Sequence, residues 1–117
     1  MSVRMRITRN GRETTVLIAP AQVFRDRWWP LAQCLGLHWI SGFNLGYPIE
    51  PEHIEDVLEE LHQLEDYLMG VASLTPDASK TAAEDAVMKN TMLTRVQNAA
   101  RELRAIRLDS HAHVWVG

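Results

Sequence analysis

Residues 51–69 (PEHIEDVLEELHQLEDYLM) constrain the fold more than any other stretch of the sequence, because their pattern predicts one amphipathic helix. Aliphatic side chains recur at helical spacing and form one apolar stripe: Ile54, Val57, Leu58, Leu61, Leu64 and Leu68. The other side carries no Lys or Arg, and its acids are Glu52, Glu55, Asp56, Glu59 and Asp66. Gly70 is a natural C-terminal stop. Such a helix has to cover a hydrophobic core with its apolar side.

Charge is strongly segregated along the chain, although the net charge is only −3. Residues 1–27 contain six arginines and two acids, whereas residues 28–79 contain nine acids and neither Lys nor Arg. The remaining residues, 80–117, contain six bases and four acids. This pattern indicates either ion pairing between elements or surfaces of opposite sign that are available to partners.

Residues 3–18 predict a β-hairpin around Asn10-Gly11, since both residues tolerate the positive φ of a type I′ turn. The predicted pairs are Arg9 with Arg12, Ile7 with Thr14, Met5 with Val16 and Val3 with Ile18. One face of this hairpin is apolar and is expected to be buried: Val3, Met5, Ile7, Val16 and Ile18.

The segments between the hairpin and the acidic helix predict a first helix, a short strand and a loop. The first helix ends at Gly36 and has a kink or break near Trp29, because Pro30 removes one hydrogen bond. Residues 37–40 (LHWI) predict a short strand, and the turn-rich stretch after them (SGFNLGYP) predicts a loop.

The residues beyond the acidic helix predict a second long helix and a final strand. The helix begins at Thr75-Pro76 or at a capping box that starts at Thr81, and it runs to about Arg107. Its expected apolar stripe is Ala83, Ala86, Val87, Leu93, Val96, Ala100, Leu103 and Ile106. Residues 111–116 (HAHVWV) alternate as a strand.

These elements predict a single α+β domain over residues 1–117. The N-terminal hairpin and the C-terminal strand share a small antiparallel or mixed sheet, with residues 37–40 as a further strand. A long antiparallel helix pair and the kinked first helix pack against this sheet. In that pair the acids of the first helix are expected near basic residues at the end of the second, which are Arg101, Arg104 and Arg107.

Several features favour a soluble cytoplasmic protein. No apolar run approaches the roughly 18–20 residues that a membrane-spanning helix needs, and the first residues lack the apolar block of a signal peptide. The single cysteine, Cys34, excludes a disulfide within the chain and suits a reducing compartment. Its apolar neighbours predict a core residue rather than a nucleophile.

The histidines raise the alternative of a metal site. His111 and His113 are two residues apart on a predicted strand, so both imidazoles are expected to point to the same side. His38 completes a three-histidine site if its predicted strand neighbours the last one. The more ordinary interpretation is two histidines on a half-exposed strand, and we expect no bound metal or other cofactor.

The stretch LDSHAHVWV resembles the opening strand of amidohydrolase barrels, in which a His pair binds a catalytic metal. In that family the strand opens a barrel of roughly 250 residues, which supplies the other ligands further along the chain. Only four residues follow His113 here, so we carry no catalytic role over from this resemblance.

Trp28 and Trp29 are adjacent, so on a helix they point roughly 100° apart and cannot both face one core. One of them is therefore a candidate for an interface, where Trp is enriched. We expect the chain to form a homo-oligomer, most simply a dimer.

The hairpin arginines raise the possibility of nucleic-acid binding. The acidic balance of the chain and its acidic central region argue against it, so we do not expect nucleic acid as a partner.

The sequence contains no nucleophile elbow, phosphate-binding glycine loop or dinucleotide fingerprint. We therefore favour a non-enzymatic, protein-binding or regulatory module whose partner has a basic surface. An inhibitor that works like an immunity protein or antitoxin is one form of this hypothesis. Its candidate partner-binding residues are Glu52, Glu55, Asp56, Glu59, Asp66, Trp28 and Trp29. The alternative is a small metal-dependent enzyme built on His111 and His113, with His38.

Overall fold

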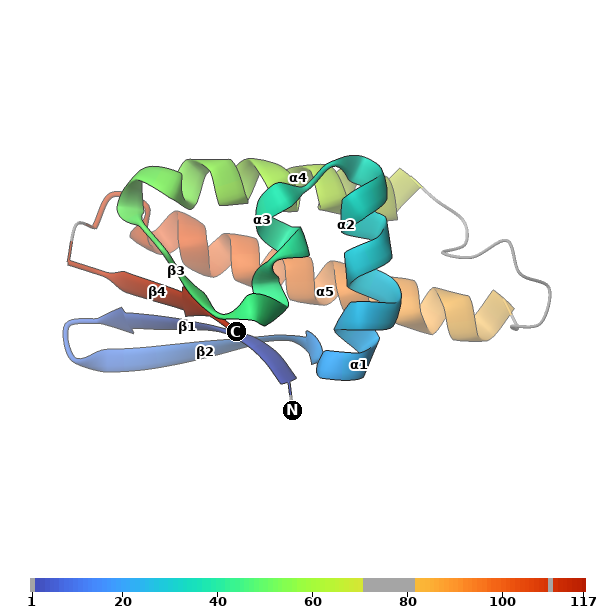
Figure 1. The fold of residues 1–117 in the computed structure, drawn as a ribbon, viewed down its shortest axis with the longest axis horizontal. Coiled ribbons are helices and arrows are strands. Elements are labelled where there is room, and N and C mark those ends of the chain that lie inside the picture. Colours follow the sequence, from blue (N-terminus) through green and yellow to red (C-terminus); the bar gives the residue numbers. More distant parts are fainter. Residues whose placement is uncertain (1, 71–81, 110) are drawn as a thin grey trace.

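The computed structural model describes residues 2–70, 82–109 and 111–117, and it has the α+β fold expected from the sequence (Figure 1). The strands are β1 (Ser2–Arg9), β2 (Arg12–Pro20), β3 (Tyr47–Ile49) and β4 (His113–Val116). The first helix comprises α1 (Ala21–Val23), a π-helical turn (Phe24–Trp28) and α2 (Trp29–Leu35). The other helices are α3 (His38–Ser41), α4 (Ile54–Gly70) and α5 (Ala82–Ile106), with 3-10 turns at Phe43–Leu45 and Pro51–His53.

The four strands form one antiparallel sheet in the order β2-β1-β4-β3. The C-terminal strand lies between the hairpin and β3, so the two ends of the chain meet in the sheet. There the backbone N–H of Gly117 donates to the carbonyl oxygen of Arg4 at 2.9 Å. The prediction that the hairpin and the last strand share a sheet is confirmed.

The hairpin has the predicted register from its turn to Met5, and its turn residues Asn10 and Gly11 have φ of 52° and 76°. Near the start of β1 the register shifts, and Val3 pairs with Ala19 instead of the predicted Ile18. A bulge lets two residues of one strand oppose one residue of the other. All five side chains of the predicted apolar face are buried, and Ala19 is buried as well.

The prediction of a strand at residues 37–40 is wrong, because this segment leads into the short helix α3. Leu37 and Ile40 are three residues apart, and both are buried, which fits a helical turn rather than a strand. The fourth strand is instead β3, within the stretch expected to be a loop. Pro48 is tolerated there because β3 is an edge strand, where one missing N–H breaks no central ladder.

The irregularity expected near Trp29 is a π-helical turn, and the helix does not break. The backbone N–H of Trp29 donates to the carbonyl oxygen of Phe24, five residues earlier. Pro30 has no N–H to donate, and the wider turn before it lets the helix continue to Gly36. Gly36 has φ of 71° and ends the helix, as predicted.

Helices α4 and α5 form the predicted antiparallel pair and run side by side (Figure 1). All six residues of the α4 stripe are buried. In α5 the buried residues are Met92, Val96, Ala99, Ala100, Leu103 and Ile106. Two expected members of its stripe, Ala86 and Val87, are exposed. The reason is length, since α5 has 25 residues and α4 has 17, so the first turns of α5 extend past their partner helix.

The starts predicted for this helix at Thr75-Pro76 and Thr81 lie outside the described residues, as does the side chain of the stripe residue Ala83. Among the helices that are described, none combines the length and apolarity that crossing a membrane requires.

Candidate functional site

The acidic side of α4 and the turn before it remains exposed in the folded chain. Its five acids, Glu52, Glu55, Asp56, Glu59 and Asp66, are all solvent-exposed. Among the described residues, the ion-pair contact of Glu52 is a long one to a histidine, with His53 Nε2 3.8 Å from its carboxylate. Asp56, Glu59 and Asp66 form no ion pair with any residue that the structure describes. This surface therefore keeps most of its negative charge available.

Within the part of the chain that the structure describes, the expected pairing of these acids with the end of α5 is limited to one long contact. Arg107 Nη1 lies 3.9 Å from Glu55 Oε1, and both side chains are substantially exposed. Arg104 instead lies 3.3 Å from His62 Nε2, and Arg101 donates to Asn98 Oδ1 on its own helix. Exposed ion pairs contribute about 0–1 kcal/mol, so this contact does little to neutralise the acidic side.

Glu60 is an acid with a structural role that the sequence pattern did not single out. Its two carboxylate oxygens accept the backbone N–H groups of Trp39, at 3.1 Å, and Ile40, at 3.0 Å. These donors belong to the first turn of α3, where no side chain of that helix itself caps the exposed N–H groups. The only signal in the sequence is the place of Glu60 beside Leu61 of the buried stripe, at the border of the acidic side.

Aromatic rings join this cap to the start of α4. The Tyr47 hydroxyl donates to the carbonyl oxygen of Trp39 at 2.6 Å, and the Trp39 ring lies 4.8 Å from the His53 ring. Burial raises the pKa of Tyr47 well above its usual range, and the nearby Glu60 carboxylate raises it further. The unfolded chain releases this proton near pH 10, so its contribution to stability is present below about pH 10 and is lost as the pH rises above that value.

The two adjacent tryptophans have different environments. Trp28 is 1% exposed and stacks on Phe24, with ring centroids 6.2 Å apart. Trp29 is 45% exposed. The suggestion that Trp28 contacts a partner is therefore corrected, because its side chain is part of the core. Trp29 is the one that a partner can reach.

The structure does not assemble the three histidines into a metal site. His38 lies on α3 rather than on a strand, and His113 lies in β4. His111 precedes β4, so strand alternation does not aim its imidazole to the same side as that of His113; its backbone N–H donates to Asp109 Oδ1 at 2.9 Å. Across the described ranges, no group of three or more His, Cys, Asp or Glu side chains is arranged to hold a metal ion.

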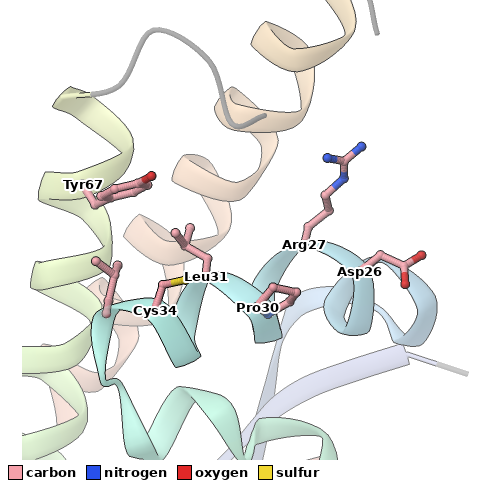
Figure 2. Close-up of a pocket in the computed structure, with 7 residues that line it drawn as sticks. Asp26, Arg27, Pro30, Leu31, Cys34 and Tyr67 are labelled. Atoms are coloured by element: carbon pink, nitrogen blue, oxygen red, sulfur yellow. The ribbon is translucent and has the colours of Figure 1, made fainter. Parts of the chain in front are cut away.

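A small cavity of about 260 Å³ lies between the first helix and the C-terminal half of α4. Figure 2 shows Leu31, Cys34 and Tyr67 around it, with Asp26 and Arg27 nearer the start of the first helix. Cys34 is exposed here, so the expectation that it belongs to the core is wrong. The helix instead turns Ala32 inward, which leaves the thiol on the cavity wall.

Comparison with protein-family models, curated proteins and solved structures found no significant match to this chain. Its function has to be inferred from its own geometry.

Proposed function

We propose that this chain is a protein-binding module that presents the acidic side of α4 to a partner with a basic surface. The observation that carries this proposal is that Asp56, Glu59 and Asp66 are exposed on one helix without an ion-pair partner among the described residues. The same helix contains no Lys or Arg, so no base on α4 itself offsets the charge.

The helix is suited to this role because its opposite side is fixed in the core. Its six stripe residues are almost fully buried, so the acids project from a rigid support. From Asp56 to Asp66 the helix rises about 15 Å, which gives an extended acidic surface rather than a single charge. Charge of one sign on such a surface speeds association with a basic partner and favours the correct orientation.

An inhibitor that works like an immunity protein or antitoxin is the form of this function that we favour. A basic substrate-binding site on the partner would be covered by the acidic helix, which would keep the partner's own anionic substrate out by charge repulsion and by volume. This mechanism requires no catalytic group on the present chain.

Reversing two of the free acids tests the proposal. In the double variant Glu59→Lys/Asp66→Lys, the partner captured from a native lysate should bind roughly ten-fold or more weakly, and its affinity should depend less on salt. Neither acid has an ion-pair partner among the described residues, so the fold should be retained. Affinity is measured by calorimetry or surface plasmon resonance over a range of salt concentrations.

The matched control is Glu13→Lys/Asp26→Lys, which changes the net charge equally but lies outside α4. It should bind the partner nearly as well as the unmodified chain. Equal losses in the two double variants would mean that only net charge matters, and unchanged binding in the α4 variant would reject the proposal.

We further propose that two copies of the chain associate through Trp29. An exposed Trp is typical of interface residues, and the 45% exposed indole of Trp29 fits this role. Sedimentation velocity should show a dimer that is lost in Trp29→Ala. A monomer at all accessible concentrations, or a dimer that this variant retains, would contradict it.

A further inference from the structure

The outer face of the sheet is a second surface with chemistry of its own. Strand residues alternate between the two faces, and the inner set is buried against the helices. The outer set includes Arg4, Arg6 and Thr8 of β1, Thr15 and Leu17 of β2, Pro48 of β3, and His113 and Trp115 of β4. In Figure 1 the hairpin lies along the lower edge of the molecule, with the helices above it. Among the described residues, no helix covers this outer face.

A shallow hollow of about 320 Å³ lies on this face around Trp115. The sheet register places Arg6 directly opposite Trp115 on one side and Pro48 opposite it on the other. Thr8, Glu13, His113 and Val114 complete the lining. Trp115 is 41% exposed, so a ligand in the hollow can reach the indole.

The indole lies beside the backbone of two glycines. A side chain at Gly46 would come within 3.4 Å of the indole ring, and one at Gly117 would come within 3.3 Å of its nitrogen. The absence of side chains at these two positions therefore leaves room that the indole occupies.

Arginines outnumber acids over the outer face and the groove at its β2 edge, although the hollow itself is lined by one Arg and one Glu. The side chain of Arg6 forms no hydrogen bond or ion pair with any residue that the structure describes, and Arg4 Nε donates to Ser2 Oγ at 2.8 Å. Arg95 and Arg101 of α5 line a groove at the β2 edge of the sheet. Thr15 and Leu17 of the outer face line the same groove. Two acids, Glu13 in the hollow and Glu102 in the groove, offset part of this charge.

We propose that the outer face of the sheet binds single-stranded nucleic acid, with one base stacked on Trp115 and the adjoining phosphates held by Arg4 and Arg6. An exposed aromatic ring flanked by guanidinium groups on an open sheet fits an unstacked base and its anionic backbone. The Glu13 carboxylate adds an acceptor for an exocyclic amino group of the base. A duplex keeps its bases stacked inside, so it cannot use the indole in this way.

The sequence alone suggested that the acidic central region would repel nucleic acid. In the folded chain, however, the acids of α4 do not oppose this binding mode. The apolar stripe of α4 faces the core, so its acids point away from the sheet. Exposed charges further apart than about 8 Å are largely screened at physiological salt. The folded chain thus separates its acidic and basic residues onto different surfaces.

Fluorescence anisotropy with short fluorescein-labelled oligodeoxycytidylate and oligocytidylate, whose bases carry an exocyclic amino group, tests the proposal, with a duplex of the same length for comparison. Trp115→Ala should weaken single-strand binding by roughly 5- to 150-fold, since a stacked base is lost. Arg6→Gln should reduce the slope of log affinity against log salt by about 0.7, the value for one phosphate contact on a single strand. Arg6 lies on an exposed face, so this variant keeps the proposal testable if Trp115→Ala fails to fold.

The controls are Leu108→Ala, which removes another exposed apolar side chain, and Arg25→Gln, which removes another exposed guanidinium. Both should bind like the unmodified chain. No single-strand binding at low salt, equal binding of duplex and single strand, or unaltered binding by Trp115→Ala and Arg6→Gln would each overturn the proposal. So would a result in which these two variants disrupt only association with a protein or with a second copy of the chain.

This proposal is separable from the function proposed for α4. The Glu59→Lys/Asp66→Lys variant should lose its protein partner and keep its affinity for the oligonucleotide. A loss of oligonucleotide affinity in that variant as large as in Trp115→Ala would place the nucleic acid on α4 and overturn the assignment to the sheet.

Discussion

Trp28→Ala is expected to lower the free energy of unfolding by about 3–5 kcal/mol, the usual range for removal of a buried Trp. Trp29→Ala should lower it by no more than about 1 kcal/mol. The two residues are neighbours of the same type, so they serve as each other's control. Trp28 is 1% exposed and stacks on Phe24, whereas nearly half of the Trp29 surface is in solvent.

Urea denaturation followed by far-ultraviolet circular dichroism measures both variants. If Trp28→Ala does not fold, Trp28→Phe keeps an aromatic ring in the core and should show a smaller loss of unfolding free energy. Equal effects at the two positions would mean that the π-helical turn does not orient the helix as described. A larger loss of unfolding free energy in Trp29→Ala would mean that Trp29, rather than Trp28, is the core residue.

Local sequence signals were sufficient for the hairpin and for α4. Asn10-Gly11 specifies its turn by backbone conformation alone, and the α4 stripe needs only helical periodicity. The LHWI segment is different, because two of its backbone N–H groups donate to Glu60, about twenty residues later in the chain. The local sequence of this segment does not reveal that contact, and its apolar content fits a strand or a helix equally well.

The candidate sites could be predicted only in part, for the same reason. The acidic side of α4 follows from the helix pattern, but which acids stay unpaired depends on the packing of α5. The neighbourhood of Trp115 and Arg6 depends on pairing between strands at opposite ends of the chain. Such a register is set by the whole core, so the exposed indole beside an arginine could not be recognised from the sequence.

Glu60→Ala is expected to lower the free energy of unfolding by about 1–3 kcal/mol, because two backbone N–H groups of α3 lose a charged acceptor. Glu59→Ala, one residue earlier, should change it by less than about 0.5 kcal/mol, since Glu59 is exposed. Chemical denaturation measures the difference. Glu60→Gln keeps one acceptor oxygen and should fall between Glu60→Ala and the unmodified chain.

Hydrogen exchange shows whether the loss in Glu60→Ala arises at α3. The amides of Trp39 and Ile40 donate to Glu60, so their exchange should accelerate in Glu60→Ala and not in Glu59→Ala. The pKa of Tyr47 gives a second readout, because the Glu60 charge raises it in addition to burial. Removing that charge should lower the pKa of Tyr47 while burial keeps it above its usual value. A stability loss without faster exchange at these two amides would mean that Glu60 stabilises α4 itself rather than capping α3.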